Sequence, residues 1–399
     1  MLRHLFTLMW NRRRANALLI VEILLAFVVL FAVGTIGAGL WANYRQPLGF
    51  EYANAWQVNV SFGSQPPAER FGTMQQVLGR LRALPGVQEA ALSTSNTPFS
   101  FNDSQTSVEK TDAQGRVEHG VDEVNMYLIG PELRRVLDLK LTAGRWFDQR
   151  DAAPGAHGPV VIDEQLRQAF FPASAQALGQ LLTFDKKQYR VVGVVQAYRT
   201  DGELQKPVPA IMQPVFAADT FLLPDALLLR VQPGSGAALE KRLTDEIRRI
   251  GPSWSATVRT LPEMHESQMK QLLTKPVLLG LMSIFLLLNV ALGLFGVLWL
   301  NINQRRAELG VRRALGAPAG AISGQIVGEI LVLTTFGLVL GLLVAAQFPL
   351  LGAFEVPAGV YLMAMLLAAV GLYLLAAVCA LYPSQLAARI QPAVALREE

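Results

Sequence analysis

The chain has very little cysteine and histidine, and this scarcity excludes several classes of function. Its one cysteine, Cys379, lies within an apolar segment, so no disulfide can form within the chain and a small apolar packing role is expected. Its four histidines lack the spacing of metal ligands and are expected at the surface: His4, His119, His157 and His265. The sequence therefore predicts no metal site.

Nucleotide-binding and hydrolase motifs are missing as well. The dipeptide Gly-Lys never occurs, which excludes a phosphate-binding loop of the form G-x-x-x-x-G-K-[ST]. Neither G-x-S-x-G nor H-E-x-x-H is present. Two adjacent carboxylate pairs, at 122–123 and 163–164, are expected to be solvated or to cap helices, because neighbouring residues on a strand point to opposite faces. We predict a chain without catalytic residues or a cofactor of its own.

Apolar residues are abundant instead, at 52% of the chain, with 17% charged residues. Four apolar runs approach or exceed the roughly 20 residues that cross a bilayer as a helix. The first run is too long for a cleaved signal peptide and predicts a retained anchor. The predicted fold is a membrane protein of four transmembrane helices, with a large α+β extracytoplasmic domain between helices 1 and 2. The expected segments are transmembrane helices at 17–40, 276–300, 322–348 and 359–382, the large domain at 41–275 and a short outer loop at 349–358.

The positions of the basic residues predict the orientation. Ten arginines flank the predicted spans on one side, whereas residues 349–357 contain no lysine or arginine. By the positive-inside rule, both termini are cytoplasmic and the large domain lies outside. The net charge of +4 is thus explained by topology, and no recognition motif supports nucleic-acid binding. The ten are Arg3, Arg12, Arg13, Arg14, Arg305, Arg306, Arg312, Arg313, Arg389 and Arg397.

The two ends of the chain lie outside the predicted spans. Residues 1–16 place apolar side chains at helical spacing, which suits an amphipathic helix lying among membrane lipids at the inner face. A simple basic segment before the first span explains the pattern equally well. Residues 383–399 are expected to form a cytoplasmic tail.

Strand and helix patterns divide the large domain. Residues 50–95 and 221–262 each read as a β-α-β unit, and Ser235 is expected to cap the helix of the second unit. Two such units can pack into one α/β layer. Residues 96–220 read as an inserted subdomain that is richer in strands and turns.

The cytoplasmic segment 301–321 is a candidate docking site. Glu308 and Arg312 are spaced four residues apart, which stabilises a helix. Leu309, Val311 and Leu315 offer an apolar contact for a groove. The residues alone fit equally a basic segment that anchors the spans at lipid headgroups. The candidate docking residues are Arg305, Arg306, Glu308, Leu309, Arg312, Arg313 and Leu315.

Polar residues and glycines within the spans are further candidates. Glu22 is expected to reach Arg13 or Arg14 at the interface, Asn289 to hydrogen-bond a neighbour, and Glu329 to pair across helices or face the bundle interior. Glycines at four-residue spacing allow helices to approach closely, either within the chain or at a seam between two copies. These glycines are Gly34, Gly324, Gly328, Gly337 and Gly341.

Several blocks, taken in order, carry a resemblance to a known family. Residues 305–317, R-R-A-E-L-G-V-R-R-A-L-G-A, resemble a segment of FtsX/MacB-type ABC transporter permeases. So do residues 139–147 (L-K-L-T-A-G-R-W-F), 160–164 (V-V-I-D-E), 189–195 (Y-R-V-V-G-V-V) and the ending at 382–396. Each block is weak by itself, but together they span nearly the whole chain. Asp163 departs from the pattern, which often has Asn there.

The resemblance implies a permease in the bacterial inner membrane. A separate cytoplasmic ABC ATPase, which binds ATP and Mg²⁺, would dock on 301–321, and two identical or related permeases would pair. MacB itself carries a fused ATPase domain, so a stand-alone permease is expected here. The implied activity is mechanotransmission for export of a peptide, antibiotic or lipid-linked substrate, with an adaptor or outer-membrane protein as a further partner.

Three alternatives remain open at this point. One is lipoprotein release in the manner of Lol permeases. The second is regulation of a cell-wall hydrolase, and the third is a membrane-anchored receptor without an ATPase.

Overall fold

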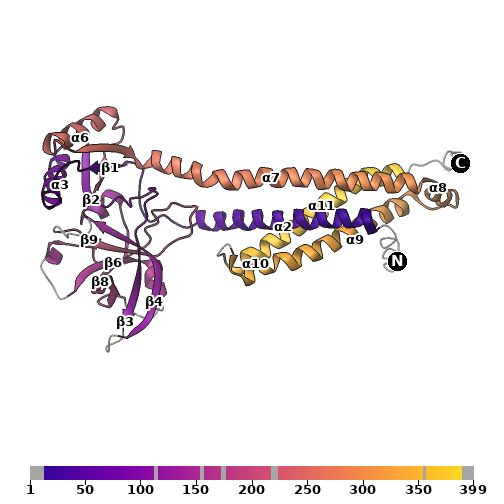
Figure 1. Cartoon of the computed structure of the whole chain (residues 1–399), viewed down its shortest axis with the longest axis horizontal. Coiled ribbons are helices and arrows are strands. Elements are labelled where there is room, and N and C mark those ends of the chain that lie inside the picture. The colour runs from indigo at the N-terminus through magenta and orange to yellow at the C-terminus, as the bar shows by residue number, and fades with distance from the viewer. Residues whose placement is uncertain are drawn as a thin grey trace. The chain divides into compact units, whose positions relative to one another are not determined.

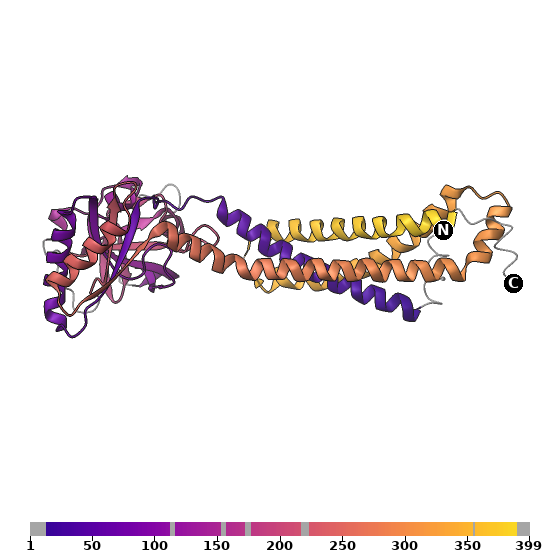
Figure 2. The same cartoon turned by 90° about the horizontal axis from the view of Figure 1, so that it is seen from above.

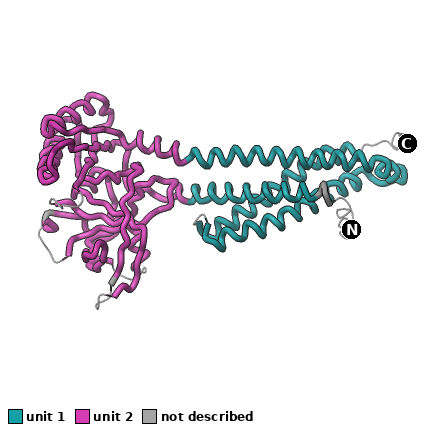
Figure 3. The backbone as a smooth tube through the Cα atoms, viewed as in Figure 1, with its two compact units in different colours: residues 1–42, 273–399 teal, residues 43–272 magenta. Residues whose placement is uncertain are grey.

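The computed structural model describes residues 13–111, 116–152, 157–171, 177–216, 223–353 and 356–388. The chain forms two compact units, which Figure 3 colours separately. The helical unit comprises residues 1–42 and 273–399, and the sheet unit comprises residues 43–272. The chain therefore passes from one unit to the other twice, after Ala42 and after Leu272.

Four long apolar helices dominate the helical unit (Figure 1). Each contains a stretch long and apolar enough to cross a membrane, and helices suit this role because all their backbone groups bond internally. This confirms the predicted fold class of four membrane helices with a large α+β domain between the first and second. The four long helices are α2 (Arg13–Tyr44), α7 (Leu261–Gln304), α9 (Ala319–Ala345) and α11 (Ala358–Ala388). The short helix α8 (Arg306–Ala314) lies between α7 and α9, and the short helix α10 (Gln347–Leu350) lies between α9 and α11.

The first span packs through one face. Ile23, Phe27 and Phe31 recur every four residues on α2 and are at most 1% exposed. The ring of Phe31 lies 5.6 Å from that of Phe348 and 6.3 Å from that of Tyr361. Helices α9 and α11 pack against one another, and in the view of Figure 2 the indigo α2 crosses α7 at an angle. This packing defines the interior of the helical unit and leaves the remaining apolar side chains exposed for lipid.

The second long helix begins earlier than expected. We predicted a span at 276–300, but α7 starts at Leu261 and continues through Pro276. Its start is fixed by Thr260, whose hydroxyl accepts from the Glu263 N–H at 3.2 Å, while the Glu263 carboxylate accepts from the Thr260 N–H at 3.4 Å. This reciprocal capping box satisfies two backbone donors that the first turn would otherwise leave unpaired.

The fourth long helix extends beyond its expected end. Helix α11 continues through Pro383 to Ala388, so the first part of the segment expected as a tail is helical. The predicted amphipathic helix at 1–16 lies largely outside the described residues, as do Arg389 and Arg397.

Four strands of the sheet unit form an open layer in the order β11-β1-β10-β2. Every neighbouring pair is antiparallel, so β1 runs parallel to β2, which follows it through α3, and β10 runs parallel to β11, which follows it through α6. The two β-α-β units thus interleave, in the ferredoxin-like arrangement. The elements are β1 (Ala55–Ser61), α3 (Pro67–Arg82), β2 (Val87–Ser93), β10 (Ala226–Val231), α6 (Ala237–Ile250) and β11 (Ser255–Thr260).

The strands between these units close on themselves. The pairing runs β4-β3-β7-β8-β6-β9 and returns from β9 to β4, while β5 adds to β8. Apolar side chains including Val108, Val160 and Leu182 form a separate buried cluster there. The elements are β3 (Gln105–Thr111), β4 (Val117–Ile129), α4 (Leu133–Leu137), β5 (Leu141–Gly144), a 3-10 turn (Gln149–Ala152), β6 (Gly158–Asp163), α5 (Glu164–Phe170), β7 (Leu181–Phe184), β8 (Lys187–Val195) and β9 (Ala210–Pro214).

The predicted helix cap at Ser235 is wrong. Gly236 occupies the N-cap position of α6 and provides no side-chain bond. The Ser235 hydroxyl donates back to the Gln232 carbonyl at 2.8 Å, because the turn through Gly234, with φ of 83°, directs the chain away from the helix start. Ser235 lies one residue before the N-cap, so its hydroxyl stabilises the turn and does not cap the helix.

Candidate functional site

The short helix α8 joins the second and third spans. Leu309 is 6% exposed and belongs to the apolar core of the helical unit, so this face of α8 packs inward. Gly316 follows the helix with φ of 92°, a left-handed conformation that glycine adopts without strain and that ends helices. Pro318 is the N-cap residue of α9, and its ring holds φ near the value seen here, so the chain is extended just before the third span.

A closed ring of five polar side chains ties α8 and its preceding residue to α9. Both oxygens of Glu329 accept from Nη1 of Arg305, at 3.0 and 3.1 Å. Gln325 donates to Glu329 at 3.1 Å and accepts from Arg312 at 2.9 Å. Arg312 donates to Glu308 at 2.5 Å, and Glu308 lies 3.5 Å from Nε of Arg305. We call these five residues the α8–α9 ring.

The ring makes the position of α8 depend on α9. It contains two arginines and two glutamates, so its formal charges cancel. The side chains of Arg305 and Glu329 are only 18% and 24% exposed, which strengthens their attraction relative to a pair in open water. Moving α8 away from α9 would therefore break charge-assisted hydrogen bonds and leave partly buried charges unpaired.

The other face of α8 is open. Val311 is 42% exposed and Leu315 is 84% exposed. Arg313 donates to the Ala317 carbonyl at 3.1 Å, within the turn that follows the helix, and Arg306 begins the helix. We expected Leu309, Val311 and Leu315 to form the apolar contact for a partner. Only Val311 and Leu315 are exposed for it, because Leu309 packs into the interior of the helical unit.

The polar residues of the spans have separate environments. Glu329 belongs to the ring. Glu22 lies against Gly293 of α7, where an added Cβ would approach Oε2 at 2.6 Å. Asn289 donates to the carbonyl of Phe285 in its own helix, at 2.8 Å. Glu22 and Asn289 thus form no common site with Glu329, and Gln325 is the ring member that sequence reasoning missed. Its spacing of four residues before Glu329 was the available signal.

The glycines divide into two groups. A Cβ on Gly337 would lie 2.6 Å from Ile23 and one on Gly341 would lie 2.6 Å from Phe27, so both allow α9 to pack against α2. Gly34 faces Ala364 at a relaxed 3.6 Å. A Cβ on Gly324 or Gly328 would meet no atom of the described chain within 4 Å. The first group serves packing within the chain, and the second lies on an open face of α9.

Two glycines in the resemblance blocks have a structural role. Gly144 and Gly193 are paired between β5 and β8. A Cβ on Gly193 would lie 2.2 Å from the Arg145 carbonyl oxygen, and one on Gly144 would lie 2.4 Å from that of Val192. Only glycine permits this approach. The neighbouring Arg145 forms two hydrogen bonds with Asp151, at 2.6 and 2.7 Å.

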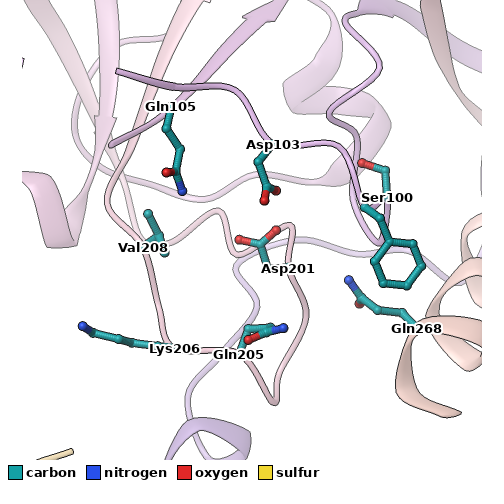
Figure 4. Close-up of a pocket in the computed structure, with 9 residues that line it drawn as sticks. Ser100, Asp103, Gln105, Asp201, Gln205, Lys206, Val208 and Gln268 are labelled. Atoms are coloured by element: carbon teal, nitrogen blue, oxygen red, sulfur yellow. The ribbon is translucent and has the colours of Figure 1, made fainter. Parts of the chain in front are cut away.

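A cavity of about 260 Å³ opens in the sheet unit (Figure 4). The carboxylates of Asp103 and Asp201 point toward one another across it. Burial, and secondarily the charge of Asp103, raises the pKa of Asp201, to which the Asn125 amide donates at 3.3 Å. Burial and the nearby negative charge thus both favour the neutral form of the Asp201 carboxyl group. The lining residues are Ser100, Phe101, Asp103, Gln105, Asp201, Gln205, Lys206, Val208 and Gln268.

Asp163 is a buried helix cap rather than a solvated residue. It is 1% exposed, and its Oδ1 accepts from the Leu166 N–H at 2.8 Å at the start of α5. Burial raises its pKa to about 7, although the backbone donors of Leu166 and Ala210 oppose the shift. Because this value exceeds the ordinary 3.8, the stabilising contribution is complete below pH 3.8 and is lost as the pH rises through about 7.

We therefore expect Asp163→Asn, which keeps the accepting oxygen, to flatten the dependence of stability on pH. Each unit of pKa difference corresponds to about 1.4 kcal/mol. Thermal unfolding of the purified chain between pH 5 and 8 measures the effect. Asp122→Asn, at an exposed carboxylate, is the control and should retain the native slope. An unchanged slope in Asp163→Asn would contradict the assignment.

Sequence comparison places this architecture in a family. Residues 17–249 match the MacB-like periplasmic core domain, and residues 280–392 match the FtsX-like permease C-terminal domain. The chain belongs to the MacB/FtsX family of ABC transporter permeases. This confirms the resemblance inferred from the sequence blocks and identifies the chain as a membrane permease.

Individual members of the MacB/FtsX family are moderately similar. The "Macrolide export ATP-binding/permease protein MacB 1/2" of Paracoccus denitrificans is 28% identical over 304 residues, which cover 72% of this chain and 42% of that protein. The "Macrolide export ATP-binding/permease protein MacB" of Agrobacterium fabrum is 23% identical over 348 residues, or 84% and 50%. The chain thus spans about half the length of the curated relatives it matches.

A solved structure gives a further comparison. The crystal structure of the periplasmic region of MacB from Actinobacillus actinomycetemcomitans covers 54% of this chain and 93% of its own length. Its sequence identity is 17%, and the TM-score is 0.38.

Proposed function

We propose that this chain is the permease subunit of an ABC exporter in the bacterial inner membrane. A separate ATPase subunit docks on α8 at the cytoplasmic face, and ATP hydrolysis there moves the sheet unit on the periplasmic side. Two permease copies, identical or related, complete the transporter. The substrate is a peptide, an antibiotic or a lipid-linked molecule that is expelled by mechanotransmission, and an adaptor or outer-membrane protein is a further partner.

The α8–α9 ring is the observation that carries this proposal. Helix α8 exposes Val311 and is followed by the exposed Leu315, while Arg305 and Arg312 bind Glu329 and Gln325 of the third span. A partner that displaced α8 would therefore act on α9 through hydrogen bonds rather than through a loose loop. A basic segment that only anchored the chain at headgroups would gain nothing from a charge-balanced attachment to α9.

Leu315→Asp is expected to lower co-purification of a soluble ATPase at least about tenfold, because an apolar interface anchor is commonly worth about 2 kcal/mol or more. The chain is purified from its native membrane in mild detergent, and co-purifying proteins are identified by mass spectrometry. Leu350→Asp is the matched control, since Leu350 is 82% exposed at the other end of α9, in α10.

The outcomes distinguish a permease with an ATPase partner from the receptor alternative. An ATPase that accompanies the native chain and Leu350→Asp but not Leu315→Asp supports docking on α8. A second permease in the same sample identifies a related partner chain. If the native chain remains folded and no ATPase accompanies it, the exporter proposal fails and the receptor alternative is favoured.

A further inference from the structure

Arg199 is a buried arginine in the loop that follows β8. It is 6% exposed, and its guanidinium donates four hydrogen bonds, all to backbone carbonyls. Nη1 donates to Asn43 at 3.1 Å and Gln46 at 2.9 Å. Nη2 donates to Glu203 at 3.0 Å and Gln205 at 2.9 Å. Its two ends thus bind different segments of the sheet unit.

One of these segments is where the chain enters the sheet unit from the first span. We call residues 43–48 the first connector, because the unit begins at Asn43. Besides the bonds from the guanidinium, the Arg199 N–H donates to the Leu48 carbonyl at 3.1 Å. The Asn43 amide donates in turn to the Leu204 carbonyl at 3.1 Å. The loop 199–205 and the first connector are therefore bound from both sides.

The same loop contacts the segment through which the chain leaves the sheet unit. We call residues 261–272, the first turns of α7, the second connector. Glu203 Oε2 lies 2.8 Å from Nε2 of His265, and their side chains are 14% and 20% exposed. Gly202, at φ of 83°, lies so close to Gln268 that an added Cβ would be 2.7 Å from its Oε1. The loop thus reaches both connectors.

The chemistry of Arg199 explains why arginine is needed. A planar guanidinium offers five N–H donors in a fixed fork, whereas a lysine ammonium offers three donors at one point. Four acceptors on two segments match the fork and exceed what an ammonium can satisfy. Burial lowers the pKa of Arg199, while the charges of Glu203 and Asp201 oppose that effect. Removing the side chain would take the guanidinium donors away from all four carbonyl groups.

We propose that loop 199–205 is a coupling strap, in which Arg199 is the positioning residue that makes the first and second connectors move together. When one connector is displaced, loop 199–205 moves with it and displaces the other connector and the sheet. This inference rests on the proposed function, because it gives the sheet unit a means of responding to movement of the spans. The strap lies wholly within the sheet unit.

The test measures the distance between the connectors directly. The full chain, with Cys379→Ala, carries spin labels at Arg45→Cys and Ser267→Cys in lipid nanodiscs, and pulsed electron paramagnetic resonance gives the distance distribution. Both label positions are exposed. We expect a narrow distribution in this background, a broad one with Arg199→Met, and an intermediate one with Arg199→Lys.

Arg230→Met is the matched control. Arg230 also donates to a backbone carbonyl in the sheet unit, that of Val136 at 2.8 Å, but contacts neither connector through that bond. Its distribution should remain narrow. A distribution in Arg199→Met as narrow as in Arg230→Met, with both chains folded by circular dichroism, would overturn the strap.

A milder variant covers the case in which Arg199→Met does not fold. Asn43→Ala removes only the bond to Leu204 and should broaden the distribution by a smaller amount. An unchanged distribution in Asn43→Ala would then count against the strap. Because the measurement needs neither ATPase nor substrate, its result is independent of whether an ATPase co-purifies with the chain.

Discussion

Glu329→Leu is expected to destabilise the helical unit by about 2 kcal/mol and to release α8 from α9. The substitution leaves Arg305 partly buried without its main acceptor and removes the bond from Gln325. Breaking one partner of a fully buried pair costs about 3–5 kcal/mol, and the remaining exposure of this pair reduces that figure. Thermal unfolding of the purified chain in detergent measures the loss as a lower Tm.

Two controls make this prediction specific. Glu266→Gln disrupts an exposed ion pair with Lys270, at 2.6 Å, and is expected to leave the Tm close to that of the native chain, because solvent screens exposed pairs. Combining Arg305→Leu with Glu329→Leu should recover part of the loss, because no charge is then left unpaired. If Glu329→Leu behaves like Glu266→Gln, the ring does not stabilise α8.

Gly337→Ala and Gly324→Ala are expected to have opposite effects. At Gly337, the new methyl group would lie 2.6 Å from Ile23, and this overpacking should cost about 1–3 kcal/mol despite alanine's better helix propensity. At Gly324, the methyl group meets nothing within 4 Å, so helix propensity alone should add up to about 1 kcal/mol. Unfolding of both variants under identical conditions measures the contrast, and a similar loss in both would contradict the assigned packing.

A larger substitution tests whether the open glycine face of α9 is a contact between two permease copies. If two permease copies meet along Gly324 and Gly328, Gly324→Leu should lower the dimer fraction without lowering the stability of the single chain. Analytical ultracentrifugation in detergent measures the dimer fraction. A dimer fraction equal to that of the native chain would place the seam elsewhere.

The apolar runs predicted the four spans because their length and composition are properties of continuous sequence. The early start of α7 was also encoded locally, since Thr260, Pro262 and Glu263 form a recognisable helix beginning, although the predicted span began only at residue 276. Two β-α-β units could be recognised from their patterns. Their interleaving could not, because it depends on pairing between β1 and β10, which are far apart in the chain.

In the candidate site, too, contacts between residues close in the chain were predictable and contacts between distant residues were not. The bond between Glu308 and Arg312 follows from helical spacing, and the structure contains it. The bond between Arg305 and Glu329 spans 24 residues and two helices, so the sequence could suggest a partner for Glu329 without naming it. Arg199 carried no signal, because its four acceptors are backbone carbonyls, which every residue has.

Charge cancellation within the ring also limits the electrostatic attraction between α8 and anionic lipid headgroups. Since Arg305 and Arg312 are balanced by Glu308 and Glu329, Arg306 and Arg313 supply the net positive charge of the segment. Each basic residue near anionic headgroups is worth about 1 kcal/mol, and salt screens this attraction. Adhesion of α8 to lipid should therefore be weak and sensitive to ionic strength, whereas its attachment to α9 persists when the lipid composition changes.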